Sequence, residues 1–135
     1  MSNTKGIIPA VFLSVVFLSQ AVAAGLWDGE ELRLVGEGPV VAYALAPDYM
    51  AYGLGRGNDL DEAKANAVAA CDTPLCDRGE KGSMVPACIS VAGHPDGRFT
   101  AGFDFSRGSS EKVVLEKCAR EVGEGCELVG TICSQ

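Results

Sequence analysis

Several residues and motifs on which metal, redox and nucleotide sites depend are scarce or missing in this sequence of 135 residues. It has one histidine, His94, and no two of its six cysteines are separated by two residues. Structural zinc sites usually take cysteines from closely spaced pairs, and thioredoxin-like redox sites use Cys-x-x-Cys. The closest pair here, Cys71 and Cys76, has four intervening residues. The sequence therefore predicts no metal site and no cofactor.

Basic side chains are also in short supply. Lysine and arginine total 11 against 18 aspartates and glutamates, which gives a formal net charge of -7 at pH 7. Nucleic acids and anionic lipid surfaces are bound by clustered lysines and arginines. Nucleic-acid binding is therefore the least favoured function. A partner that recognises this chain through charge is expected to be basic.

A catalytic triad is not supported by the residues around the single histidine. Such a triad needs His94 to be held by a carboxylate and to lie beside a serine. Asp96 and Ser90 are near it in sequence, but strand and turn geometry gives no reason for the three side chains to converge. An exposed histidine in a turn is the favoured interpretation.

Two other patterns imitate functional sites. Gly53–Gly57 lies between a predicted strand and a predicted helix, but it completes neither a dinucleotide fingerprint nor a P-loop. Tight-turn glycines are the favoured interpretation. The carboxylate pairs Glu30–Glu31 and Asp59/Asp61 resemble glycosidase acids, yet solvated loop charges and helix caps explain them better. No catalytic residue is predicted, and the chain is not expected to be an enzyme.

The N-terminal segment has the parts of a secretory signal peptide. Lys5 precedes an apolar run from residue 7 to 18, and small residues follow at Ala21–Ala24. Cleavage before Ala24 is predicted, so residues 1–23 form the signal peptide. An uncleaved membrane anchor is the alternative, but Pro9 and Ser14 interrupt a run already short for a span. The mature protein is expected to be periplasmic or extracellular, without stable membrane insertion.

The mature chain is expected to be a monomer with one disulfide-stapled domain. Residues 24–39 are a lead-in segment, and residues 40–135 form a single domain. All six cysteines lie in this mature part. An even number of cysteines in a small exported protein is typical of a disulfide framework.

Hydrophobic periodicity and turn residues predict the secondary structure. Two buried stripes are expected on the helices. They comprise Leu60, Ala63, Ala67, Ala70 and Cys71 in the first helix and Val114, Leu115, Cys118, Ala119 and Val122 in the second. The alanines predict that the first helix approaches its sheet closely. The expected elements are strands at 40–46 and 49–55, a helix from 59 to 71, a loop at 77–83, strands at 84–92 and 98–105, a helix at 109–122 and a strand at 126–133.

The two halves of the domain agree feature by feature. Ala46–Asp48 matches His94–Asp96, and Cys71, Cys76 and Cys88 match Cys118, Cys126 and Cys133. This internal repetition predicts an α+β fold built of two tandem ββα(β) repeats. We expect a pseudo-twofold antiparallel sheet with both helices on one face.

The repeat resembles a known family, catalogued as domain of unknown function 4189. The residues that carry the resemblance span nearly all of the mature chain, from about 40 to 133. They are Glu62, Ala63, Ala67, Cys71, Cys76, Cys88, Cys118, Cys126 and Cys133. The second helix departs from the family pattern, with Glu111-Lys112-Val113 where the family favours Glu-Ala-Xaa. The resemblance implies a small exported bacterial protein and supplies no catalytic residue.

Six cysteines allow fifteen pairings, and sequence alone does not choose among them. The symmetry of the halves favours Cys71–Cys76, Cys118–Cys126 and Cys88–Cys133, with the last pair joining the two halves. The expected function is an exported binding or interaction module with an unknown protein or envelope partner. Two alternatives stay open: a small secreted hydrolase that uses His94, and a proteinaceous inhibitor of a cationic envelope hydrolase.

Overall fold

The structure is a computed structural model and describes residues 32–135. The predicted signal peptide, residues 24–31 of the predicted lead-in and the carboxylate pair Glu30–Glu31 lie outside the described residues. Those interpretations remain predictions.

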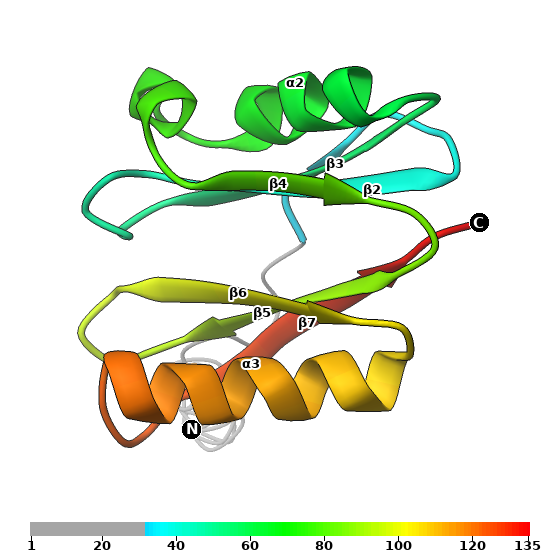
Figure 1. The fold of residues 1–135 in the computed structure, drawn as a ribbon. Helices are drawn as coiled ribbons and strands as arrows, with labels where there is room; N and C mark the ends of the chain where they lie inside the picture. The colour runs from blue at the N-terminus through cyan, green and yellow to red at the C-terminus, as the bar shows by residue number, and fades with distance from the viewer. Residues whose placement is uncertain (1–31) are drawn as a thin grey trace, which may run out of the picture.

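Two β-sheets lie face to face, and one α-helix covers the outer face of each (Figure 1). The predicted α+β class is confirmed. The expected single sheet with both helices on one face is wrong, because the chain crosses from the first sheet to the second after Met84. Strands β2 (Val40–Leu45) and β5 (Cys88–Gly93) are buried on both faces over nearly their whole length, so each sheet needs cover from the other sheet as well as from a helix.

The first sheet has four strands in the order β1-β3-β2-β4. Strands β2 and β3 form the predicted antiparallel hairpin, β1 runs parallel to β3, and β4 is antiparallel to β2. The predicted loop at 77–83 is wrong in part, because its end forms β4. Lys81-Gly82-Ser83 offers no β-branched or aromatic residue to indicate a strand. The bounds are Leu34–Val35 for β1, Val40–Leu45 for β2, Tyr52–Gly57 for β3 and Lys81–Met84 for β4.

The second sheet has three strands in the order β6-β5-β7, all antiparallel. Central strand β5 is buried along its whole length. The predicted strand at 84–92 is therefore two elements: its first residue belongs to β4, and the rest begins β5 beyond the Val85-Pro86 connection. The bounds are Cys88–Gly93 for β5, Phe99–Asp104 for β6 and Glu127–Cys133 for β7.

Each helix begins at a capping residue. Asp59 accepts a hydrogen bond from the Glu62 backbone N–H at 2.8 Å, as the capping prediction requires. Ser106 does the same for Ser109 at 3.2 Å, so the second helix starts earlier than expected. The bounds are Leu60–Ala70 for α2, Pro74–Arg78 for the 3-10 helix η1 and Arg107–Glu121 for α3.

The core has three layers that follow from strand alternation. The large side chains of β2, such as Val41 and Leu45, point between the sheets with those of β5 and β6. The small ones, such as Ala42 and Ala44, face helix α2. Ala63, Ala67, Val114 and Cys118 are buried as predicted. Leu60 and Ala119 were expected in the buried stripes but are exposed, because they lie at the edges of the helix faces.

Three disulfides join Cys71 to Cys76, Cys118 to Cys126, and Cys88 to Cys133. They are the pairs that the symmetry of the sequence favours. Cys88–Cys133, which was expected to join the two halves of the repeat, links neighbouring strands β5 and β7 of the second sheet. Disulfides of this kind form outside the reducing cytosol. The protein therefore belongs in an oxidising compartment.

Candidate functional site

The three residues of the triad considered from sequence do not form one site. Nδ1 of His94 lies 3.0 Å from Oδ1 of Asp96, so these two side chains do meet. Ser90 lies four residues earlier on β5, about 13 Å along a strand. Its hydroxyl is 2.7 Å from those of Ser110 and Thr131 in the interior. The Ser90 hydroxyl is therefore not placed to act as a nucleophile for His94.

Asp96 serves the turn between β5 and β6. Its Oδ2 lies 2.7 Å from Nη2 and 2.8 Å from Nε of Arg98, and its Oδ1 accepts the Arg98 backbone N–H. These hydrogen bonds hold the pKa of the Asp96 carboxyl well below its ordinary value, and they raise that of Arg98. The carboxylate and guanidinium therefore stay charged and hold the turn closed.

Ser90 belongs to a buried chain of hydroxyl groups between the second sheet and helix α3. Thr131 donates to the Glu111 carboxylate at 2.8 Å. Because the Thr131 proton is thereby used, Thr131 accepts from Ser90, and Ser90 in turn accepts from Ser110. Ser110 shares its own proton with the Arg107 carbonyl. The chain satisfies three interior hydroxyls and fixes α3 on the sheet. Sequence analysis missed Ser110, although it lies four residues before Val114 on the buried stripe.

The glycine-rich and acidic motifs have structural explanations. Gly53, Gly55 and Gly57 lie on β3, where helix α2 passes so close that a Cβ would strike its backbone. The turn expected here is wrong, because these glycines allow a close approach of helix and sheet. Asp59 caps α2, and Asp61 lies 3.9 Å from Lys64. Among residues 32–135, no group of three or more His, Cys, Asp or Glu side chains could hold a metal.

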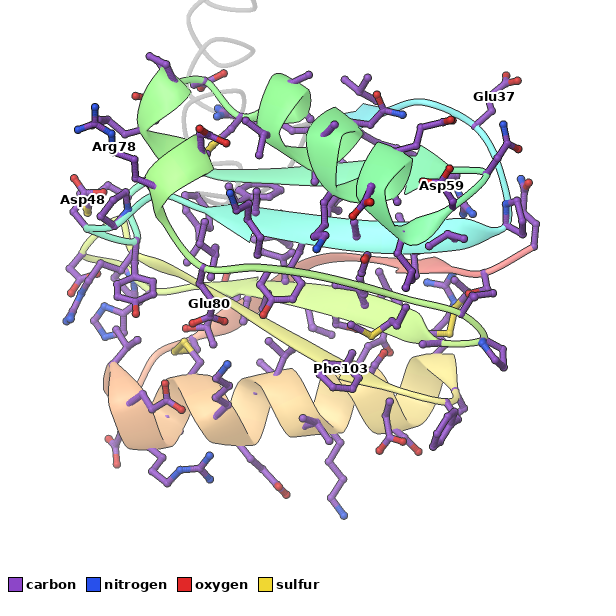
Figure 2. The ribbon with its side chains drawn as sticks, turned by 45° about the horizontal axis from the view of Figure 1, so that its top comes forward. Glu37, Asp48, Asp59, Arg78, Glu80 and Phe103 are labelled. Carbon is purple, nitrogen blue, oxygen red and sulfur yellow. A yellow bond between two sulfur atoms is a disulfide. The ribbon has the colours of Figure 1, made fainter. Side chains whose placement is uncertain are left out.

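Two separate hollows lie along the side of the molecule between edge strands β4 and β6. Together we call them the inter-sheet cleft. Figure 2 shows Glu80 and Phe103 on this open side, toward opposite ends. Its charged end is lined by Tyr49, Glu80, Arg98, Thr100, Lys117 and Glu121. Its apolar end is lined by Met84, Val85, Pro86, Phe103, Asp104 and Phe105.

Glu80 connects the first sheet to helix α3 at the charged end. The Tyr43 phenol donates to Oε2 of Glu80 at 2.9 Å, and the Lys117 ammonium lies 3.9 Å from the same oxygen. Burial, and after it the Glu80 carboxylate, raise the pKa of Tyr43 above its ordinary value. The phenol therefore stays protonated and keeps donating. Glu80 remains partly exposed and can accept a further donor from outside.

Tyr49 has a positive φ of 63°, an uncommon conformation for a residue with a side chain. Its N–H donates to Ala46 and its carbonyl accepts from Phe99, both at 2.8 Å. These bonds hold the phenol ring exposed at the charged end of the cleft. Strained backbone is often found at functional positions.

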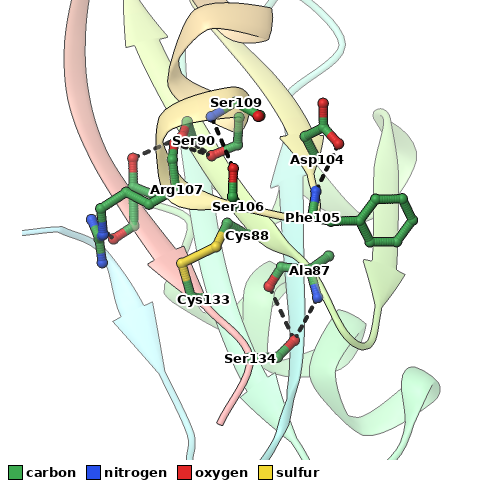
Figure 3. Close-up of a disulfide and its surroundings, with 12 residues drawn as sticks. Ala87, Cys88, Ser90, Asp104, Phe105, Ser106, Arg107, Ser109, Cys133 and Ser134 are labelled. Atoms are coloured by element: carbon green, nitrogen blue, oxygen red, sulfur yellow. Dashed lines mark hydrogen bonds between the residues drawn. A yellow bond between two sulfur atoms is a disulfide. The ribbon is translucent and has the colours of Figure 1, made fainter.

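The apolar end exposes large hydrophobic side chains. Val85 is 48% exposed, Phe103 55% and Phe105 83%. Phe99, Ala101, Phe103 and Phe105 alternate along the strand predicted at 98–105, a pattern typical of one buried face. Only the first two are buried, because β4 ends at Met84 and leaves the rest uncovered. Figure 3 shows the Phe105 ring pointing away from the Cys88–Cys133 disulfide. Clustered exposed aromatics mark interaction surfaces more often than isolated ones do.

Comparison with known proteins supports the fold alone. No family model matches the chain, and no curated protein matches it. The NMR structure of Rv1813c from Mycobacterium tuberculosis is similar, with a TM-score of 0.51 at 20% sequence identity. The match covers 73% of this chain and 78% of that one. At this identity the likeness shows a shared fold.

Proposed function

We propose that the protein is an exported, disulfide-stapled interaction module that binds a partner through the inter-sheet cleft. The observation that carries the proposal is the pair of exposed rings at Phe103 and Phe105 beside exposed Val85. Exposing apolar surface costs solubility, and aromatic anchors are the residues that contribute most to interface energy. The three disulfides support the rigid scaffold that such a surface needs.

The proposal also covers where the protein is located and how its two halves are related. An oxidising location combined with the predicted signal peptide favours the periplasm or the extracellular space. None of the helices within residues 32–135 has the length and apolar character of a membrane span. We also propose that the halves are tandem repeats of the domain-of-unknown-function 4189 type. The order hairpin, helix, strand, which occurs in each half, supports this.

A pull-down from native envelope and secreted fractions tests the proposed function. The bait is the oxidised mature protein, residues 24–135, and the matched bait carries Phe103→Ser and Phe105→Ser. Leu75→Ser controls for lost surface hydrophobicity, because Leu75 is an exposed apolar residue on η1, away from the apolar end. We expect a protein retained by the native and Leu75→Ser baits and released by the double variant. Equal retention by all three baits would show that the cleft is not the binding face.

The hydrolase alternative is tested separately. His94→Ala removes the only imidazole in the chain and leaves the Asp96–Arg98 bonds in place. Loss of a hydrolase activity in this variant, with an unchanged melting curve, would favour an enzyme over a binding module.

A further inference from the structure

Strand β4 is an edge strand of the first sheet. The backbone groups on its outer side have no hydrogen-bond partner among residues 32–135. The Leu45 N–H donates to the Glu80 carbonyl at 2.9 Å. Tyr43 pairs with Gly82, and Val41 pairs with Met84. Gly82 and Met84, like Glu80, therefore point their N–H and C=O groups at β2. Lys81, Ser83 and Val85 therefore present theirs to the open side. Within residues 32–135 no hydrogen bond reaches those backbone groups.

Edge strand β6, by contrast, is closed at two points. The Phe99 N–H donates to the Tyr49 carbonyl at 2.8 Å, and Lys117 donates to the Ala101 carbonyl at 3.1 Å. Ala101 itself is buried. Natural proteins commonly block sheet edges in such ways, because an open edge pairs with other strands. The same protection is missing from β4 between Lys81 and Pro86.

From this difference we infer that β4 is a docking edge for an extended segment of another protein, which adds to the first sheet as a fifth strand. The inference rests on the proposed function and specifies the occupant of the cleft. Main-chain hydrogen bonds to Ser83 and Val85 would supply affinity, and alternate side chains would supply specificity.

The side chains of the added strand meet different chemistry at the two ends. Glu80 and Met84 lie on the same face of the sheet as Tyr43, toward the second sheet. A residue of the added strand opposite Glu80 meets the carboxylate that the Tyr43 phenol and the Lys117 ammonium also contact, whereas one opposite Met84 meets Val85 and Phe103. These positions are four residues apart and share a face. The segment is therefore expected to carry Lys or Arg and an apolar residue at that spacing.

Charge favours a basic partner over a second copy of this chain. The protein carries a net charge of -7, so two copies repel each other, whereas a cationic segment is attracted. Asp104 adds a second carboxylate at the apolar end.

Selection from a phage-displayed random dodecapeptide library on the oxidised protein, residues 24–135, tests the inference. We expect enriched peptides without internal proline that carry a basic and an apolar residue four positions apart. A synthetic copy of an enriched peptide should lose about tenfold in affinity for Glu80→Gln, because a charge-assisted contact is lost. Glu116→Gln, on the exposed surface of α3, is the matched control. Failure to enrich any family, or enrichment of one without this spacing, would overturn the inference.

A proline substitution tests the backbone pairing itself. Ser83→Pro removes an outward N–H that takes no part in the β2–β4 ladder, so the fold should survive, whereas Ser83→Ala keeps the N–H. We expect peptide binding to Ser83→Ala and none to Ser83→Pro, with similar melting curves. Equal binding to both would exclude strand addition. The pull-down could still depend on Phe103 and Phe105, so the proposed function would survive that result.

Two other occupants of the β4 edge, a second copy of the protein and another part of the same chain, would give distinct results. A dimer in light scattering that Ser83→Pro abolishes would assign the edge to a second copy. Slow exchange of the Ser83 amide in the monomer without peptide would show that the chain already covers its own edge. Either result would overturn docking of a partner segment, whereas fast exchange in a monomer supports it.

Discussion

Helix α2 rests on the first sheet through backbone, whereas helix α3 rests on the second through side chains. Beneath α2 every second residue of β3 is glycine, and Ala63 and Ala67 are the only buried side chains that the helix itself contributes. Beneath α3, Val114 and Cys118 pack beside the hydroxyl chain through Ser90. Close packing is obtained in one layer by removing side chains and in the other by fitting polar and apolar groups together.

The two halves also differ in their disulfides, and removing a disulfide is expected to give the largest loss of stability. Each half has a short staple at its helix end, with sequence separations of 5 and 8, but only the second sheet has the long one, with a separation of 45. In the chain-entropy model the long pair contributes about 4 kcal/mol and each short pair about 2 kcal/mol. Denaturant melts of the three Cys→Ser double variants measure this order. Equal losses for all three would show that loop length does not set the stabilisation.

Alanine substitution of matched glycines tests the two packing modes directly. A Cβ at Gly55 would lie 2.8 Å from the carbonyl carbon of Asn66, and closer still to other α2 backbone atoms, whereas one at Gly102 would lie 3.1 Å from Cα of Val114. We expect Gly55→Ala to cost about 3 kcal/mol, at the upper end of overpacking effects, and Gly102→Ala about 1 kcal/mol or less. Thermal or denaturant melts of the two variants measure these costs. Equal costs would mean that both helices adjust equally well.

The hydroxyl chain predicts that opposite substitutions in the two layers both lower stability. Ser90→Ala should cost about 1–3 kcal/mol, because Thr131 loses its buried donor. Ala42 lies in the corresponding layer of the first sheet, where Ala42→Ser would bury a hydroxyl among alanines and glycines and cost a similar amount. A cycle of Ser90→Ala with Ser110→Ala should show coupling between the two residues. Additive losses would show that the hydroxyls act independently.

These contrasts mark where sequence patterns predict structure and where they do not. The β2–β3 hairpin, the Asp59 cap and the alanine face of α2 follow from local spacing, because each depends on neighbouring residues. The division into two sheets does not, because it depends on where β4 and β5 find partners. Strand β4 is hard to predict because Gly82 and Ser83 are not typical strand-forming residues. The backbone groups on its outer edge have no partner within residues 32–135, which is why it suits docking.

The candidate site was harder to predict than the fold. Phe103 alternates with buried Phe99 and Ala101, so its pattern is that of a core residue, and only the end of β4 at Met84 exposes it. Glu80 had no signal at all in the sequence, since it meets Tyr43 and Lys117 across distant segments. His94 and Asp96 were recognisable because they lie in one turn, yet the Ser90 hydroxyl lies away from them in the interior.

The two hairpin turns provide the comparison with the smallest expected effect. In the first, the Met50 N–H donates to Oδ1 of Asp48; in the second, Asp96 is also bound by the Arg98 guanidinium. Because the folded pKa of Asp96 is lowered, its contribution to stability is complete above the ordinary aspartate pKa and is lost as pH falls through the folded value. Arg98→Gln should therefore raise the Asp96 pKa in an NMR titration of its carboxyl carbon.

Lys117→Gln is the matched control for that titration, because Lys117 bonds to Ala101 and Glu80 and to no group of the turn. We expect it to leave the Asp96 midpoint in place. Since the Asp96 side chain is exposed to solvent, solvent screens the pair, and the effect on the unfolding free energy should be small beside those of the glycine and disulfide variants. A midpoint that shifts equally in both variants would mean that the acidity of Asp96 follows the net charge of the protein, and the turn would then owe its closure to backbone hydrogen bonds alone.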